Sequence, residues 1–272
     1  MRKIRKVIVL LAVLVALVIW IAWGNQALQL STYDIQSDRL PAAFDEFHIL
    51  QLSDLHNTQL GEGNEKLISV VKEAEPDLIV ITGDLIDSRD TKVEVALELA
   101  EKLVTIVPCY YVPGNHESRV AAYAELKTGL LACGVVILEN KTVELQRAGE
   151  KIALVGVTDP DFGEEIVLEE MIDDSTFTIL LSHRPELFET YVESGVDLVF
   201  SGHAHGGQFR VPFVGGLYAP HQGLFPQYDG GIYTEGNTTM VVSRGLGNSV
   251  IPFRINNRPE AVLVVLSGNH VG

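Results

Sequence analysis

The sequence predicts an α/β sandwich preceded by one membrane-spanning helix. In the first half of the chain, apolar runs of strand length alternate with amphipathic helical patterns. In the second half, short apolar segments separated by turns indicate antiparallel hairpins. No internal repeat, low-complexity tract or interior linker breaks this pattern, so we expect the 272 residues to hold one globular domain after a hydrophobic leader.

The composition narrows the classes of function. A hydrophobic fraction of 47% is ample for a packed core. The formal net charge of −16 disfavours a nucleic-acid partner held through its phosphates. The two cysteines, Cys109 and Cys133, stand in apolar surroundings, which favours buried thiols over a disulfide.

The leader contains 17 consecutive apolar residues, Val7 to Trp23, at the short end of the length that spans a membrane. Trp20 and Trp23 fit an interfacial aromatic belt, and the basic residues within 2–6 should stay in the cytoplasm, which makes this a single-pass protein of the cell membrane with an extracytoplasmic domain. A cleaved signal peptide has a similar apolar length, but no small-x-small site directly follows the run. We therefore expect residues 1–27 to be an uncleaved anchor. A buried soluble helix is disfavoured because the run has no polar face.

The elements follow in order from residue 28. The polar stretch 28–44, with Pro41, predicts a connector with an edge strand, and the domain is expected to span residues 45–272. Three buried strands and three amphipathic helices then alternate, and a proline or a glycine ends each helix. We expect the strands at 47–52, 77–82 and 109–112, and the helices at 65–74, 92–106 and 121–133, with Pro76, Pro108 and Gly134 as their stops.

Shorter elements make up the second half. Pro185 opens a helix that ends at Ser194. Residues 206–236 are rich in glycine, proline and aromatic side chains and hold no long periodic segment, which indicates a functional loop rather than disorder. Strands are expected at 135–138, 142–146, 152–157, 177–181, 196–200, 239–242 and 261–266.

Polar side chains that can ligate a metal follow five of these strands. His203 and His205 stand two residues apart just past a strand, among small residues, so both imidazoles can point at one centre. Singly, such residues are helix caps, turn residues or structural histidines. Carboxylates, imidazoles and one amide without a thiolate suit Mn, Fe or Zn in mixed nitrogen and oxygen coordination. Together they indicate a metal centre formed by Asp54, His56, Asp84, Asn115, His183, His203 and His205.

These residues fall into five short blocks: Asp54-x-His56, Gly83-Asp84, Gly114-Asn115-His116-Glu117, His183, and Gly202-His203-x-His205. As a set, the blocks resemble the signature of the calcineurin-like metallophosphoesterase family. The leader and the stretches 206–208, 223–226 and 243–248 resemble its membrane-anchored bacterial branch. The resemblance implies, for about residues 47–266, a four-layer α/β/β/α sandwich of two mixed sheets with the metals at the C-terminal strand ends.

The resemblance also implies a mechanism with two divalent metal ions. Such a pair acidifies a bridging water to hydroxide, which attacks phosphorus while the metals offset charge on the phosphoryl oxygens. Asp84 would bridge the ions. By the same motif, one ion is held by Asp54, His56 and His205, and the other by Asn115, His183 and His203.

Four residues outside the ligand set are candidates for catalysis and substrate binding. His116 is expected on the leaving-group side, as general acid or transition-state stabiliser oriented by a carboxylate such as Glu117 or Asp87; the alternative is a structural histidine behind the ligands. Arg119 and Arg184 suit bidentate phosphate binding, or are ordinary surface arginines.

The fourth candidate lies in the loop 206–236, which starts at the metal residues and should form a wall of the substrate site. Within this loop, His221 contacts the substrate or packs into an Ω-loop with Tyr218 and Tyr228 as neighbours.

The sequence thus predicts a membrane-tethered metallophosphoesterase acting on phosphodiester or phosphomonoester bonds. The tether and the apolar loop favour a lipid-linked or envelope substrate, such as a nucleotide–lipid pyrophosphate. One alternative is a non-catalytic membrane-held binding or scaffold module, against which all seven ligand positions are present. The other is a binuclear amide or ester hydrolase, against which no further acid or base follows a strand.

Overall fold

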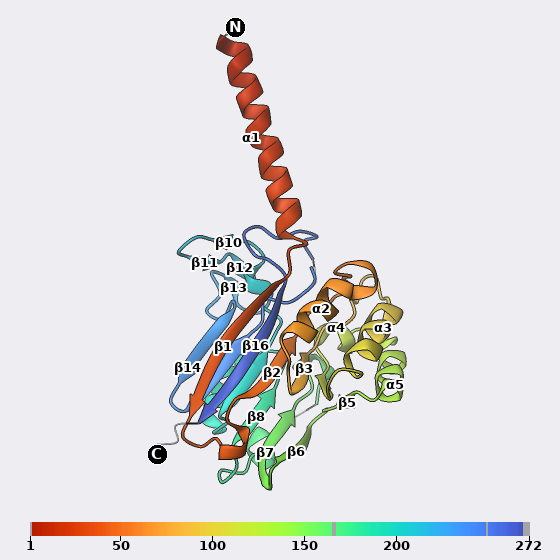
Figure 1. Ribbon diagram of the computed structural model, residues 1–272, viewed down its shortest axis with the longest axis vertical. Helices are drawn as coiled ribbons and strands as arrows, with labels where there is room; N and C mark the ends of the chain where they lie inside the picture. Colours follow the sequence, from red (N-terminus) through yellow and green to blue (C-terminus); the bar gives the residue numbers. More distant parts are fainter. Residues whose placement is uncertain (1, 165–166, 249, 269–272) are drawn as a thin grey trace.

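Two six-stranded β-sheets lie face to face, and one long N-terminal helix extends from one end of them (Figure 1). The computed structural model describes residues 2–164, 167–248 and 250–268. Helices pack on the outer face of each sheet. This arrangement confirms the predicted sandwich of two mixed sheets.

The first sheet runs in the order β1-β16-β2-β3-β4-β5. β16 is antiparallel to β2, and the other neighbours are parallel. Its outer face packs on α2, α3 and α5. The strands are β1 (Gln29–Ser37), β2 (Phe47–Leu52), β3 (Leu78–Thr82), β4 (Cys109–Val112), β5 (Val136–Ile137) and β16 (Glu260–Gly268), and the helices are α2 (Glu65–Glu73), α3 (Val93–Leu103) and α5 (Tyr123–Cys133).

The second sheet runs in the order β14-β15-β9-β8-β7-β6. Its four central strands are parallel, and the two edge strands are antiparallel to their neighbours. The helix α6 (Phe188–Glu193) packs on its outer face through Phe188 and Tyr191. The strands are β6 (Lys141–Arg147), β7 (Glu150–Gly156), β8 (Thr178–Leu181), β9 (Leu198–Ser201), β14 (Gly231–Glu235) and β15 (Thr238–Val242).

Short elements fill the connections. The region 206–236, expected to lack long periodic segments, contains two hairpins whose two-residue strands are too short to give a periodic pattern. The four-residue helix α4 (Asn115–Ser118) was not predicted. The hairpin strands are β10 (Arg210–Val211), β11 (Gly215–Gly216), β12 (Tyr218–Ala219) and β13 (Gly223–Leu224), and the 3-10 turns are η1 (Ala42–Phe44), η2 (Glu62–Asn64), η3 (Pro160–Phe162), η4 (Leu168–Met171), η5 (Pro185–Leu187) and η6 (His205–Gly207).

Alternation along the central strands separates two cores. On β3, Val80 faces the second sheet, whereas Ile79 and Ile81 face the helices, because successive strand side chains point to opposite faces. Phe200 of β9 is fully buried between the sheets. Burial of such a side chain contributes about 1.5–3 kcal/mol, and its truncation to alanine costs about 3–5 kcal/mol once the cavity is included.

Several local expectations can be compared with the structure directly. The expected edge strand in 28–44 is β1, which pairs with β16 along all of its residues, so most of this stretch belongs to the sheet. Gly134 follows α5 with a φ of 96°, the left-handed conformation of a glycine C-cap. Cys109 is a buried free thiol, and Cys133 is a free thiol that is only partly buried.

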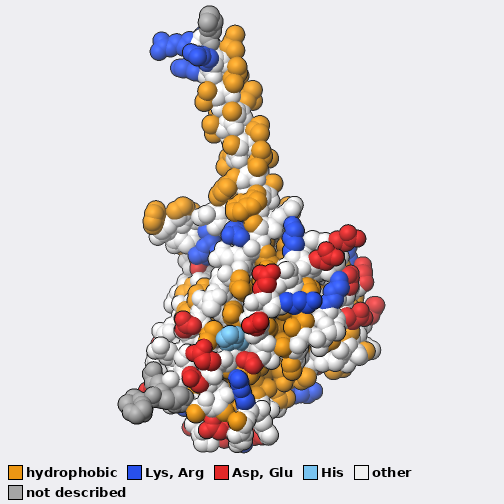
Figure 2. All heavy atoms as spheres, in the orientation of Figure 1, with side chains coloured by type: hydrophobic (Ala, Val, Ile, Leu, Met, Phe, Trp, Pro, Cys, Tyr) orange, Lys and Arg blue, Asp and Glu red, His pale blue; other side chains and the backbone are white. Residues whose placement is uncertain are grey.

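The helix α1 (Arg2–Gly24) extends away from the domain (Figure 1). It is long and apolar enough to cross a membrane, with a mean hydropathy of 2.9 over its most apolar 18 residues. Figure 2 shows hydrophobic side chains along its length and Lys and Arg side chains at its free end.

The polar strand ends and α1 lie at the same end of the sandwich. β1 follows α1 and runs away from it, β16 is parallel to β1, and β2 is antiparallel to β16. β2 therefore runs back toward α1, as do its parallel neighbours β3 and β4. The turn after β9 meets the turn after β2 where the backbone N–H of His203 donates to Asp54 (3.1 Å). The C-terminal ends of β2, β3, β4, β8 and β9 thus face the side from which α1 leaves.

Candidate metal centre

The turns after the strands hold polar side chains in an unusual backbone conformation. Asp54, His56, Asp84, His203 and His205 all have positive φ, between 44° and 67°. This left-handed region is uncommon for residues with a Cβ, and such strain costs about 1–3 kcal/mol per residue. Five strained residues at one end of two sheets indicate a functional site, because the fold must hold these side chains against a local penalty.

Close approach of the turns depends on glycine. At Gly83, where φ is +90°, a Cβ would lie 2.7 Å from the backbone nitrogen of Gly114 and 2.7 Å from Nδ1 of His183. At Gly114, a Cβ would overlap Oδ1 of Asp84. Since real Cβ atoms do not come this close, only glycine lets the turns after β3 and β4 meet around Asp84.

Two clusters of ligating atoms result. In the first, Nε2 of His56 lies 3.2 Å from Nε2 of His205, which lies 3.4 Å from Oδ1 of Asp54. In the second, Nε2 of His183 lies 3.2 Å from Oδ2 of Asp84 and 3.1 Å from Nδ1 of His203. Each cluster gathers its three ligand atoms within 4.8 Å of one another.

Asp84 lies between the two clusters. Its Oδ2 is 3.2 Å from Nε2 of His183 and 3.6 Å from Nε2 of His56. The side-chain amide of Asn115 lies beside the second cluster, 3.2 Å from Nε2 of His183. The structure therefore brings all seven predicted metal residues together, and all seven are buried.

The donor set fits metal ions. Nδ1 of His183 lies 2.7 Å from the carbonyl oxygen of Thr82, which can only accept, so Nδ1 carries a proton and Nε2 is the nitrogen that faces Asp84 and Asn115. Burial opposes the charged form of His183, but the charge of Asp84 outweighs it and raises the pKa of His183 to about 10, so a metal ion would have to displace the proton on Nε2 to bind there. Burial lowers the pKa of both His56 and His205 to about 3, so both rings are neutral. Neutral imidazoles, carboxylates and an amide oxygen that converge in this way could each hold a divalent cation.

His116 stands beside the first cluster. Its ring lies 4.5 Å from the ring of His56, measured between centroids. The backbone N–H of Ser88 donates to Nδ1 of His116 (2.9 Å), and Oδ1 of Asp87 lies 3.8 Å from the same atom. Since an N–H can only donate, Nδ1 carries a lone pair, and the neutral ring holds its proton on Nε2.

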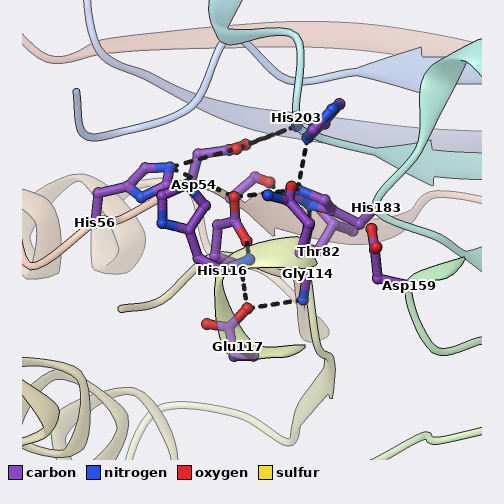
Figure 3. A network of polar contacts seen from close by, with 12 residues as sticks. Asp54, His56, Thr82, Gly114, His116, Glu117, Asp159, His183 and His203 are labelled. Atoms are coloured by element: carbon purple, nitrogen blue, oxygen red, sulfur yellow. Dashed lines mark hydrogen bonds and ion pairs between the residues drawn. The ribbon is translucent and has the colours of Figure 1, made fainter. Parts of the chain in front are cut away.

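The side chain of Glu117 binds backbone N–H groups of the neighbouring turns. Its carboxylate accepts the backbone N–H groups of Asp84 (2.9 Å), Gly114 (2.8 Å) and Ile86 (3.2 Å), which clamps the turns after β3 and β4 together (Figure 3). Burial, and then the charge of Asp84, raises the pKa of Glu117 to about 8. Sequence reasoning missed this clamp and the contact of Ser88, because both depend on backbone groups that carry no residue-type signal.

The substrate-binding candidates lie on the side of the second cluster. Arg184 is buried and pairs with Asp159 (2.7 Å), Asp161 (3.0 Å) and Glu186 (3.3 Å). Its Nη1 also lies 2.7 Å from Nδ1 of His221.

Arg119 and His221 are more open to solvent. The side chain of Arg119 is 47% exposed and pairs with Asp161 (2.7 Å). The side chain of His221 is 46% exposed, and its Nδ1 is 2.9 Å from Nε2 of His203. The loop 206–236 thus reaches the second cluster through His221.

Comparison with known proteins agrees with this geometry. The sequence profile described as calcineurin-like phosphoesterase matches residues 47–207. The chain belongs to the calcineurin-like phosphoesterase family. As a member of that family, it is a hydrolase that acts on phosphoester bonds with divalent metal, which disfavours the scaffold and amide or ester hydrolase alternatives.

Three relatives of this phosphoesterase illustrate the likeness. The metallophosphoesterase YkuE of Bacillus subtilis (strain 168) is 32% identical over 89% of this chain and 87% of its own. The phosphodiesterase YaeI of Escherichia coli (strain K12) is 28% identical over 81% of this chain and 82% of its own. The transmembrane protein with metallophosphoesterase domain of Danio rerio is 29% identical over 86% of this chain and 56% of its own.

Proposed function

We propose that this protein is a membrane-anchored phosphoesterase that uses two divalent metal ions to hydrolyse a phosphodiester or phosphomonoester bond of a lipid-linked substrate. One observation carries the proposal: two clusters of ligand atoms share Asp84 at the end of the sandwich from which α1 leaves.

Asp84 would be the ligand that both ions share, because its Oδ2 faces both clusters and two cations in close proximity need a shared anion. The donor set suits Mn, Fe or Zn. When bound, the ions supply a water of lowered pKa as nucleophile and positive charge for the phosphoryl oxygens. One ion would be held by Asp54, His56 and His205, and the other by Asn115, His183 and His203.

His116 protonates the leaving group. Its Nδ1 accepts from the backbone N–H of Ser88, so the proton available for transfer is on Nε2. Arg119 and His221 contact the substrate phosphate, since both side chains are about half exposed beside the second cluster. Arg184 holds His221 in place, because its own guanidinium is already paired with three carboxylates.

The anchor sets the location of the site. α1 is the membrane-spanning segment, its basic residues stay in the cytoplasm, and the catalytic domain lies outside. Protease added to intact cells should therefore degrade the domain. A domain that resists protease in intact cells and is cut only after lysis would contradict this orientation.

A turnover screen with metal analysis tests the function. Purified full-length protein should hydrolyse a chromogenic phosphodiester and a lipid-linked pyrophosphate, lose activity in EDTA and regain it with Mn²⁺. Asp84→Asn should lose bound metal and activity while remaining folded, and Asp90→Asn, at a 72% exposed side chain, is the matched control. Full activity of Asp84→Asn, or indifference to chelators with no bound metal, would overturn the proposal.

A further inference from the structure

Most of the large exposed apolar side chains of the domain lie in two stretches, 211–225 and 250–253. Phe213 is fully exposed, and Val250 and Leu224 are 77% and 68% exposed. Scattered exposed apolar residues are ordinary, but a contiguous group of this kind marks an interaction surface. We call this group the apolar rim: Val211, Phe213, Val214, Tyr218, Leu224, Phe225, Val250 and Phe253.

The apolar rim lies at the base of α1. Its two stretches are joined where Phe209 pairs with Ile255 and where the rings of Phe209 and Phe253 meet at 5.4 Å. The same segment holds the end of α1, because the backbone N–H of Arg254 donates to Oδ1 of Asn25 (2.7 Å). Figure 1 shows the hairpins β10 to β13 beside the lower end of α1, and Figure 2 shows hydrophobic side chains projecting there.

Two arginines next to the apolar rim hold positive charge without a carboxylate hydrogen-bond partner among the described residues. Arg254 is buried and donates to the backbone oxygens of Arg244 and Gly247 and to the side chain of Asn248. Arg258 donates to the carbonyl oxygens that follow α1, and its guanidinium lies 5.3 Å from the ring centroid of Trp23. Both arginines line a cavity of about 190 Å³ between α1 and the domain.

Apolar side chains beside arginines that form no hydrogen bond to a described carboxylate match the layered chemistry of a bilayer surface, where acyl chains meet phosphate groups. We propose that the apolar rim inserts into the outer leaflet around α1, with the partly exposed Arg258 toward anionic lipid phosphates and the buried Arg254 adding positive charge behind it. This docking rests on the membrane anchor of the proposed function. The occupant is lipid rather than a second protein, because the rim adjoins the base of a helix whose residues 7–23 are all apolar.

Docking would hold the metal centre at a fixed distance from the bilayer. The first hairpin, β10–β11, begins within five residues of His205, and Asn257 donates to the backbone oxygen of His205 (2.7 Å). The lipid-contacting stretches are therefore connected to His205, a predicted metal ligand, through the backbone and through one hydrogen bond. A phosphoester held at the headgroup level would reach the site without leaving the membrane.

Depth-dependent quenching tests the docking in the full-length protein. In a Trp20→Phe/Trp23→Phe background, a single tryptophan is introduced as Phe213→Trp or Leu224→Trp, and the protein is placed in nanodiscs whose lipids carry bromine near the headgroup end of the acyl chains. The control is Leu131→Trp, a 54% exposed apolar position near the end of α5, which runs away from the strand ends. Both rim tryptophans should be quenched several-fold more than the control, and more strongly with phosphatidylglycerol than with phosphatidylcholine alone.

The outcomes separate docking from anchoring and from catalysis. Equal quenching at the rim and at position 131, in protein that resists carbonate extraction, would overturn the docking and leave the anchor intact. Release of the full-length protein by carbonate would overturn both. Hydrolysis of a soluble chromogenic phosphodiester by the same samples reports the metal centre independently. Phe213→Ser/Leu224→Ser should lower turnover of a lipid-linked substrate at least tenfold and leave the soluble substrate unchanged, and equal turnover of both would contradict a role of docking in substrate access.

Discussion

The backbone N–H of Ser88 donates to Nδ1 of His116 over 2.9 Å, which leaves the proton of the neutral ring on Nε2. If this proton goes to the leaving group, His116→Ala should lower kcat by roughly 100- to 10,000-fold for a phosphodiester with a basic leaving group. A p-nitrophenyl ester, whose leaving group departs without a proton, should lose much less. The measurement is kcat across a series of aryl phosphodiesters.

The control is Ser88→Ala, which removes a hydroxyl group 3.2 Å from Nδ1 but keeps the backbone donor. It should act like the wild type across the same series. An equal loss for all leaving groups in His116→Ala would instead make His116 a structural residue.

Gly114→Ala should disturb the metal centre although it replaces none of the predicted metal ligands. The new Cβ would overlap Oδ1 of Asp84 and lie 2.8 Å from its backbone nitrogen, so the shared carboxylate must move. A displacement of about 1 Å at a catalytic group lowers the rate about 100-fold. Metal content per protein and kcat on a soluble substrate are the readouts. Gly149→Ala, strained by its φ of +88° but with open space around the new Cβ, should lower stability alone. Normal metal content in Gly114→Ala would refute the close fit.

Glu117→Gln should destabilise the domain by about 1–3 kcal/mol, because one of the three clamped N–H groups must then face an NH₂ group. Thermal and urea unfolding of the full-length protein in detergent would measure this loss. Glu98→Gln, at an exposed ion pair with Lys102, should change stability by less than about 0.5 kcal/mol. Matching stabilities of the two variants would show that the clamp carries no net stabilisation.

The two thiols should react at very different rates with a thiol reagent. Burial raises the pKa of Cys109 to about 12, so almost no thiolate, the reactive form, is present near neutral pH. Cys133 is only partly buried and should supply the single fast phase, which speeds up as the pH rises and more thiolate forms. Cys133→Ser should abolish that phase, and Cys109 should react only after unfolding. Two fast thiols in the folded protein would contradict the packing of β4.

The sequence alone predicts those strands and metal ligands that are determined by residue type. The mostly apolar segments 47–52 and 77–82 give β2 and β3 with nearly the expected bounds, because central strands that are covered on both faces are rich in Val, Ile and Leu. Asp54 and His203 were found because they belong to a set of ligand-type residues that follows five strands, although each residue alone has a structural explanation. Their meeting across two sheets then follows from the parallel strand ends.

Other features could not be predicted because they depend on tertiary backbone contacts. Ser88 acts through its N–H, which every residue except proline has, and Glu117 folds back onto N–H groups 31 and 33 residues away. The hairpins β10 to β13 have two-residue strands, too short for any period. The pairing of Arg184 with Asp159 joins residues 25 apart through the fold, so Arg184 could not be distinguished from an open phosphate ligand.

The pairing of β1 with β16 has a mechanical consequence. Only four residues separate the end of α1 from the start of β1, and the nine residues of β1 are in register with a strand that adjoins β2. A rotation of α1 therefore passes into the sheet that carries Asp54, rather than being absorbed by a flexible linker. With α1 in the membrane as we propose, this connection would hold the metal residues at a fixed height above the bilayer, so the enzyme should act on phosphates at that height in preference to phosphates free in solution.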